Sequence, residues 1–243
     1  MANKPNYGID APAVIRWLFF FGAISFAIAF GAYFFLRGTE SFYAPLICGY
    51  FCLNALAFLI PAGWMVYGSL TGKQKILSDL IQDLHLKGNE RILDLGCGRG
   101  MFLIEVAKHL PQGRAFGIDL WFEKDQSGNG PESALQNAEI EGVRDRVEVL
   151  TADMCELPFP DQTFDLVVSS LAIHNLPDSE DRTQALKETL RVLKPGGRFA
   201  LLDLKNGPEY AAILRQNGGI AVKLSSPHYH YFPPVRIVKG KKE

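Results

Sequence analysis

An excess of positive charge is missing from this sequence. Its 243 residues include 25 lysines and arginines against 26 aspartates and glutamates, for a net charge of -1. Because no basic surface of any size is implied, the composition does not indicate a nucleic-acid partner. The four cysteines stand at unrelated positions and do not make a disulfide framework. We therefore expect a reduced domain that faces the cytosol.

Charged residues are also absent from two long stretches near the N-terminus, residues 17–36 and 42–70. Each stretch is long enough to cross the hydrocarbon core of a bilayer as a helix. The pattern predicts a transmembrane helical hairpin, with spans at about 17–36 and 42–66. Pro45 and Pro61 are expected to kink the second span or to mark its ends.

The predicted hairpin divides the chain into a membrane anchor over residues 1–70 and a catalytic domain over residues 71–243. A small-residue face formed by Ala23, Ala27 and Gly31, at every fourth position, predicts where the two helices approach. The two ends of the hairpin carry positive residues, whereas the loop between the helices carries one positive and one negative residue. This difference predicts that both termini and the catalytic domain lie in the cytoplasm. The charged residues concerned are Lys4, Arg16, Lys73 and Lys75 at the ends and Arg37 and Glu40 in the loop.

Two other interpretations of the apolar stretches are weaker. A cleaved secretory signal would have a shorter apolar region and would leave the second stretch unexplained. A buried core hairpin would need a very large core, since phenylalanine and isoleucine occur all round the predicted helices.

The decapeptide RILDLGCGRG, residues 91–100, is the most informative part of the chain. Its apolar half is typical of a buried parallel strand, and Gly96, Gly98 and Gly100 follow at alternate positions before a helical run. Glycines at the carboxyl end of a strand let the backbone approach a ligand closely. Asp94 adds a carboxylate where the ammonium group of a ligand could bind.

A second predicted strand, residues 114–120, carries Asp119 near its end, about twenty residues after the glycine loop. An acid in this position is placed to accept hydrogen bonds from ribose hydroxyls, so the two segments together predict a nucleoside cofactor site. A dinucleotide site is less favoured, because Met101 stands where its fingerprint has a third glycine.

Further segments extend the same pattern. Asp153 and Met154 follow a third expected strand at 147–150. Residues 164–170 are expected to form a fourth strand, and LRVLKPGG over residues 190–197 precedes a fifth. With the glycine loop, these segments resemble the class I S-adenosylmethionine-dependent methyltransferases over roughly residues 75–240. The small-molecule branch is the most similar, including the methyltransferases of ubiquinone and menaquinone biosynthesis.

The resemblance implies S-adenosylmethionine as the cofactor. In the family the glycine loop holds the methionine part of the cofactor. An acid at the position of Asp119 binds the ribose, and an acid at the position of Asp153 binds the adenine amino group. Met154 would pack on the adenine ring. The cofactor-binding residues expected in this way are Asp94, Gly96, Cys97, Gly98, Gly100, Asp119, Leu120, Asp153, Met154 and Ser170.

Strands alternate with helices in the remainder of the catalytic part, which predicts a Rossmann-like, doubly wound and mostly parallel α/β sheet. The expected helices are residues 75–86, 131–141, 179–193 and 209–217. The expected strands are those named above, with strand five at 198–204 and two last strands at 220–225 and 229–238.

His174 is the candidate catalytic base, because it follows strand four, where it would face the transferring methyl group. Quinone methyltransferases often have Arg-Asn at this point, so His174 departs from their pattern. The alternative role for His174 is to close over the cofactor through a backbone hydrogen bond, and Asn175 is expected to shape the same loop.

Two further features have open interpretations. The segment 121–130 is an insertion after the ribose acid, in which Trp121 and Phe122 either wall the ligand or cover the core. His228 and His230 would share one face of an extended strand. A third ligand for a metal is missing, so no metal site is expected.

We expect a membrane-bound enzyme that methylates a small, apolar or lipid-like acceptor at the cytoplasmic membrane surface. Methylation of a soluble thiol or amine is the alternative within enzymes. The alternative from another class is a non-catalytic, cofactor-binding interaction module. The sequence predicts neither the accepting atom nor the oligomeric state.

Overall fold

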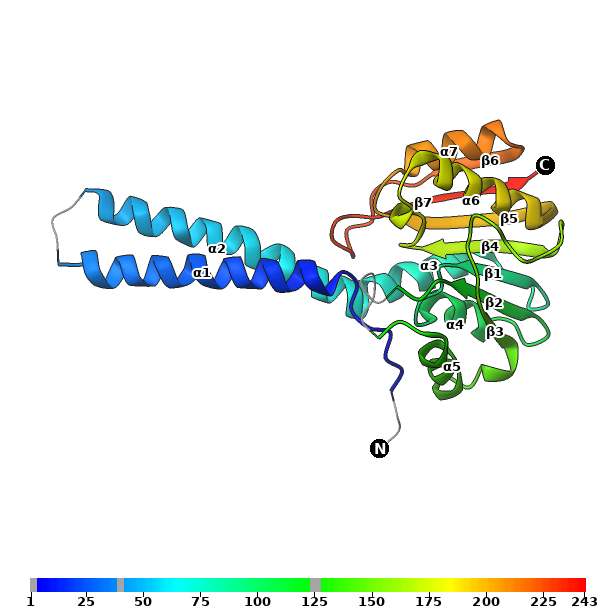
Figure 1. Ribbon diagram of the computed structural model, residues 1–243, viewed down its shortest axis with the longest axis horizontal. Helices are drawn as coiled ribbons and strands as arrows, with labels where there is room; N and C mark the ends of the chain where they lie inside the picture. The colour runs from blue at the N-terminus through cyan, green and yellow to red at the C-terminus, as the bar shows by residue number, and fades with distance from the viewer. Residues whose placement is uncertain (1–3, 39–41, 123–127) are drawn as a thin grey trace.

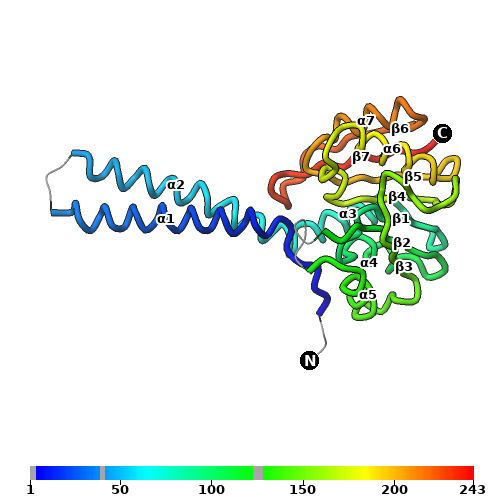
Figure 2. The backbone as a smooth tube through the Cα atoms, viewed as in Figure 1, coloured from blue at the N-terminus to red at the C-terminus, as the bar shows by residue number. Residues whose placement is uncertain are grey.

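The computed structural model describes residues 4–38, 42–122 and 128–243, and it divides visibly into a helical hairpin and an α/β body (Figures 1 and 2). The hairpin consists of α1 (Pro12–Leu36) and α2 (Tyr43–Tyr67). The elements of the body are η1 (Gly68–Gly72), α3 (Lys73–Leu84), β1 (Arg91–Leu95), α4 (Met101–Lys108), β2 (Arg114–Asp119), α5 (Pro131–Ile140), η2 (Arg144–Arg146), β3 (Val147–Thr151), β4 (Phe164–Ser170), η3 (Ile173–Asn175), α6 (Ser179–Val192), β5 (Leu193–Asp203), α7 (Gly207–Gln216), β6 (Gly219–Leu224) and β7 (Arg236–Lys242).

The body is built on a seven-stranded sheet in the order β3-β2-β1-β4-β5-β7-β6. Strands β1 to β5 are parallel, and β7 runs antiparallel between β5 and β6. The doubly wound, mostly parallel sheet predicted from the alternation of elements is therefore confirmed. Strand order reverses between β1 and β4, and ligands of such sheets bind at the carboxyl ends of the strands beside that point.

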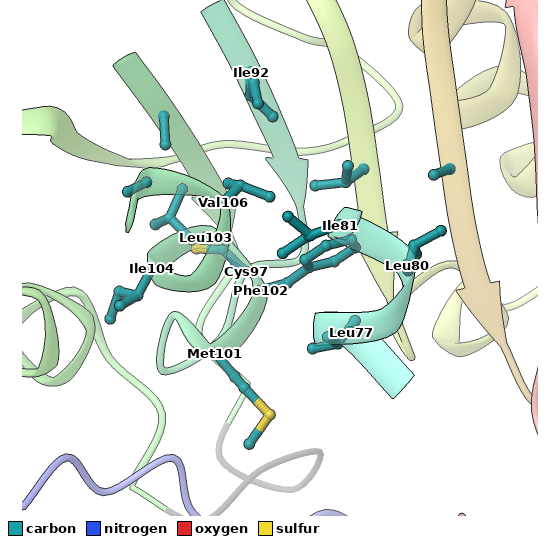
Figure 3. Packing of buried hydrophobic residues seen from close by; sticks show 14 of the residues in the cluster. Leu77, Leu80, Ile81, Ile92, Cys97, Met101, Phe102, Leu103, Ile104 and Val106 are labelled. Carbon is teal, nitrogen blue, oxygen red and sulfur yellow. The ribbon is translucent and has the colours of Figure 1, made fainter. Parts of the chain in front are cut away.

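Helices cover both faces of the sheet and bury two apolar clusters. On one face α3, α4 and α5 pack on strand residues such as Ile92, Leu166 and Val168. On the other face α6 and α7 pack on alternate strand residues such as Leu93 and Val167. Figure 3 shows Leu77, Leu80 and Ile81 of α3 beside Phe102 of α4 in the first cluster. The side chains that alternate along β1 therefore point to two different cores, which explains why Ile92, Leu93 and Leu95 are all apolar.

The two helices of the hairpin lie side by side and project from the body (Figures 1 and 2). Their contact face on α1 is formed by Gly22, Ser25 and Ala29, which are buried, whereas Ala23 and Ala27 are exposed. The prediction that Ala23, Ala27 and Gly31 form the contact face was therefore wrong, and the helix uses an adjacent face instead. The direct evidence is Gly22, where a Cβ atom would lie 2.6 Å from Cδ2 of Leu59.

The second apolar helix does not end where the body begins. Helix α2 continues through η1 into α3, so that one helix runs from Tyr43 to Leu84. Pro61 lies inside α2 and does not end it. The loop between β6 and β7 contacts this helix where it enters the body, because Nε1 of Trp64 donates to the carbonyl oxygen of Tyr229 at 3.1 Å.

Two strand predictions need correction. Strand β5 begins at Leu193, earlier than the expected 198, since its first residue pairs with Phe164 before a register shift. The last strand was expected at 229–238 but forms at Arg236–Lys242. Residues 229–235 belong to the loop, where the Phe232–Pro233 peptide bond is cis. His228 and His230 therefore do not share the face of a strand.

Candidate functional site

A cavity of about 350 Å³ opens at the carboxyl edge of the sheet, beside the point between β1 and β4 where the strand order reverses. Most of the residues predicted to bind a cofactor line this cavity. They are Asp94, Gly96, Cys97, Gly98, Asp119, Leu120, Asp153, Met154 and Ser170. Gly100 is not among the described lining residues, and instead it starts α4 with a left-handed backbone (φ 84°).

The glycine loop after β1 is shaped by two close contacts. Gly96 has a φ of 68°, and a Cβ atom there would lie 2.2 Å from Cβ of Ala172 in the segment after β4. Since no larger residue fits, the loop can approach both β4 and a ligand. The backbone N–H of Gly98 donates to Oδ2 of Asp119 at 2.8 Å, which ties the loop to the end of β2.

Asp119 is the link between the glycine loop and the segment that follows β2. Besides its bond to Gly98, its Oδ1 accepts from the backbone N–H of Trp121 at 2.6 Å and from Nδ2 of Asn129 at 3.3 Å. Each carboxylate oxygen has more than one lone-pair site, so the group can still accept bonds from a ligand in the cavity. Asp119 therefore supports the loop and faces the cavity at once.

Asp94 is a buried carboxylate on the cavity wall, with only 1 % of its surface exposed. Neither oxygen has a hydrogen-bond partner among the residues that the structure describes. Burial, and then the nearby charge of Asp119, raise the pKa of Asp94 well above its usual range. A buried acid of this kind is costly unless a cation reaches it, so Asp94 is suited to hold an ammonium group.

The far side of the cavity is formed by Asp153 and Met154, which follow β3. Oδ1 of Asp153 accepts from the backbone N–H of Cys155 at 2.8 Å, and Met154 packs against the second apolar cluster. Ser170, at the end of β4, has a buried hydroxyl for which the described part of the chain offers no partner. These groups give the cavity an acceptor, an apolar wall and a hydroxyl within one ligand-sized space.

The structure places His174 away from the cavity, against the end of β5. Its backbone N–H donates to Oδ2 of Asp203 at 3.1 Å. Its Nδ1 lies 2.6 Å from Oδ1 of Asp203, but the angles at this contact are not those of a hydrogen bond. The hydroxyl of Tyr210 also donates to Asp203, at 3.2 Å. Among the described lining residues, Ala172 and Asn175 are present and His174 is not. This position favours a supporting role for His174 over that of a base.

The insertion after β2 is described at its two ends only, and residues 123–127 lie outside the described chain. Phe122 lines the cavity, and Nε1 of Trp121 donates to Oγ1 of Thr151 at 2.7 Å. Within the described ranges, no three metal-ligating side chains come together.

Several lining residues were not predicted from the sequence, and two of them are charged, Asp10 and Lys73. Asp10 belongs to the segment before α1, and nothing in its local pattern indicates a site. The position of Lys73 could have been recognised from the sequence. It lies on one face of the helix with Ile76, Leu77 and Leu80, all of which are buried. A lysine on the apolar face of a helix is rarely buried without a partner.

Comparisons with known proteins agree with the fold and the cavity. Residues 93–201 match a family model described as a methyltransferase domain. A demethylmenaquinone methyltransferase from Lactiplantibacillus plantarum is 40% identical over 121 residues, which are 49% of this chain and 47% of the relative. A ubiquinone/menaquinone biosynthesis C-methyltransferase from Geotalea daltonii is 32% identical over 157 residues, which are 60% of this chain and 62% of the relative. The chain thus spans about half the length of the first of these relatives.

Among solved structures, an S-adenosylmethionine-dependent methyltransferase from Aquifex aeolicus superposes with a TM-score of 0.57 at 20% identity. The superposition covers 75% of this chain and 98% of that one. At this identity the likeness concerns the fold. Residues 93–201 are therefore similar to a methyltransferase domain, and the named relatives and the cavity support S-adenosylmethionine as the cofactor of this site.

Proposed function

We propose that this protein transfers the methyl group of S-adenosylmethionine to a small, apolar or lipid-like acceptor at the cytoplasmic surface of a membrane. The observation that carries the proposal is the position of the cavity at the root of the apolar hairpin. Its wall includes Asp10, two residues before α1 begins, and Lys73, the first residue of α3. An acceptor that leaves a bilayer beside the hairpin would therefore be close to the cofactor.

The residues of the cavity suit the parts of the cofactor. Asp94 would hold the ammonium group of the methionine part, and Asp119 the ribose hydroxyls. Asp153 and Met154 would hold the adenine. S-adenosylmethionine supplies an activated sulfonium methyl group, so the protein contributes chiefly by holding the reactants close and aligned.

The hairpin has the surface of a membrane segment. Both of its helices are long and apolar enough to cross a bilayer. With 25 residues, α1 measures about 37 Å at 1.5 Å per residue. Most large apolar side chains on it face outward, and Phe30 and Phe35 are 64% and 82% exposed. A soluble protein rarely shows so large an apolar surface, whereas lipid would cover it.

The acceptor class follows from the same geometry and from the relatives. The apolar side chains of Phe122, Leu171 and Leu176 line the cavity. Two of the relatives are named for the methylation of quinone-type lipids. A quinone-like molecule is therefore one member of the proposed class, and His174 is a point at which this chain departs from the quinone enzymes.

The proposal can be tested with a labelled cofactor. Native membranes that contain the full chain are incubated with S-adenosylmethionine labelled in its methyl group, and lipids are then extracted. We expect the label in an organic-soluble product that is heavier than its precursor by one methylene, and not with the Asp119→Ala variant. Label in water-soluble thiols or amines alone would contradict the lipid-like acceptor. No transfer to any acceptor would contradict catalysis and favour a cofactor-binding module.

We also propose that His174 positions the loop after β4 and does not remove a proton. A general base contributes about 10²–10⁴ to turnover, whereas a supporting side chain contributes less. We expect His174→Gln to change single-turnover rates by less than about tenfold and to leave the shape of the pH–rate profile unchanged. Loss of one limb of the profile in the variant would restore His174 as the base.

A further inference from the structure

A buried ion pair joins the segment before the hairpin to the first turn of α3. Nζ of Lys73 lies 2.9 Å from Oδ1 and 2.8 Å from Oδ2 of Asp10. The side chains are 7% and 15% exposed. The hydroxyl of Tyr231 donates to Oδ2 of Asp10 at 3.0 Å, and the backbone N–H of Asp10 donates to Oγ of Ser69 at 3.2 Å. Both charges are thus nearly removed from water.

Such a pair is weak evidence for a purely stabilising role. Removing two charges from water costs free energy, and apolar side chains of similar volume often stabilise a core equally well. This pair also lines the cofactor cavity, together with Asp94. Its position on a ligand cavity therefore needs an explanation that stability alone does not give.

The charges around the cavity are unequal. Four carboxylates line it, those of Asp10, Asp94, Asp119 and Asp153, and Lys73 is the single lysine or arginine among the described lining residues. S-adenosylmethionine brings one anionic group, the carboxylate of its methionine part. On the same carbon it carries the ammonium group assigned to Asp94. The protein groups that hold the two must be neighbours, and Lys73 and Asp94 line the same cavity. The charge of Lys73 is also the smallest of the influences on the pKa of Asp94, and it opposes the rise that burial causes.

We propose that Lys73 binds the carboxylate of the cofactor's methionine part and that Asp10 occupies Lys73 until the cofactor arrives. The proposal rests on the proposed contact between Asp94 and the ammonium group. Lys73 exchanges one carboxylate partner for another, so its charge is never left unpaired in a buried place. Asp10 keeps the hydrogen bond from Tyr231 after the exchange.

The exchange would connect the cofactor site to the membrane segment. Residues 4–11 cross the body before α1, since the backbone N–H of Asn6 donates to Oδ1 of Asn137 at 2.9 Å and Nδ2 of Asn137 donates to Asn6 O at 2.9 Å. Nδ2 of Asn137 also donates to the carbonyl oxygen of Arg99 in the glycine loop, at 2.9 Å. The segment that carries Asp10 is thus held by Lys73 on the cavity wall and by Asn137 of α5, which also contacts the glycine loop, and it leads directly into the hairpin.

Binding calorimetry with the full chain in detergent micelles tests this without any acceptor. Two ligands are compared, S-adenosylhomocysteine and S-adenosyl-3-thiopropylamine, which differ only in the carboxylate. We expect the wild type to prefer S-adenosylhomocysteine by about 10- to 100-fold, the size of a hydrogen bond between charged groups. Lys73→Gln should reduce this preference to near unity while leaving the affinity for the amine ligand within about twofold.

Three further variants complete the design. Asp10→Asn should raise the affinity for S-adenosylhomocysteine by about threefold or more. In this variant Lys73 has no ion pair to give up before it can bind the carboxylate of the ligand. Asp10→Asn with Lys73→Gln replaces the charged pair by amides, and it serves if Lys73→Gln alone does not fold. This double variant should also lose the preference. Lys75→Gln, an exposed lysine of the same helix, is the matched control and should keep it.

A preference that survives both Lys73→Gln and the double variant would overturn the assignment of Lys73. Weaker binding of S-adenosylhomocysteine to Asp10→Asn would overturn the exchange. If the wild type bound neither nucleoside, the cofactor assignment itself would be wrong, which is a different result from the loss of the carboxylate preference alone.

Discussion

Replacing Asp119 with alanine is expected to weaken the binding of S-adenosylmethionine by about ten- to a hundredfold. The carboxylate faces the cavity and would accept bonds from the ribose hydroxyls. It also accepts the backbone N–H groups of Gly98 and Trp121, which hold the glycine loop and the segment after β2. The variant loses both the ligand contacts and the support of the loop, so the effect should lie near the upper end of this range. Calorimetry measures it directly.

The matched control for this variant is Asp145→Ala. Asp145 is an acid in η2 whose side chain is 77% exposed, and it does not line the described cavity. We expect its removal to leave the affinity unchanged and the fold intact. Unchanged affinity in Asp119→Ala, or tighter binding of NAD than of S-adenosylmethionine to the wild type, would contradict the site.

The second large effect concerns the membrane. If α1 and α2 cross the bilayer, the full chain should stay in the membrane fraction through high-salt and carbonate washes and be released by detergent. A variant that starts at Thr71 should be found in the soluble fraction and still bind the cofactor, because the buried residues of both apolar clusters all lie after Thr71. Fractionation followed by calorimetry measures both properties.

This second experiment has two informative failures. Recovery of the intact chain in the soluble fraction without detergent would contradict the membrane hairpin. Digestion of the catalytic domain by a protease added outside intact cells would contradict the proposed orientation. In the variant that starts at Thr71, Asp10 is absent and Lys73 lacks its partner, so the exchange proposed above predicts that S-adenosylhomocysteine binds at least as well as to the full chain.

Local pattern was sufficient for most elements of the fold. The apolar run of β1, the glycines after it and the acid at the end of β2 lie in short segments, and their roles depend on alternation along a strand and on the turn that follows. The hairpin was evident because two long uncharged stretches need no partner to be recognised. The boundaries were less certain, as the early start of β5 and the late start of β7 show.

Where two elements meet depended on the tertiary structure. The face of α1 that packs on α2 is set by the fit of Gly22 against Leu59, and a repeat of small residues does not determine which of two adjacent faces is used. The orientation of the His174 side chain also depends on a tertiary contact, with the buried Asp203 at the end of β5. A histidine after β4 can face the ligand or the neighbouring strand, and both are compatible with the same sequence.

The sequence by itself determined the doubly wound sheet, the glycine loop, the acids at the strand ends and the apolar hairpin, because each of these is written in residues close together in the chain. Only the tertiary structure brought Asp10, Lys73 and Tyr231 together at the cavity, since these residues are separated by 63 and 221 positions from Asp10. Such contacts arise from packing the segment before α1 and the loop before β7 around the start of α3. Packing of distant segments follows from the complementary shapes and charges of the whole molecule, and no local periodicity records it.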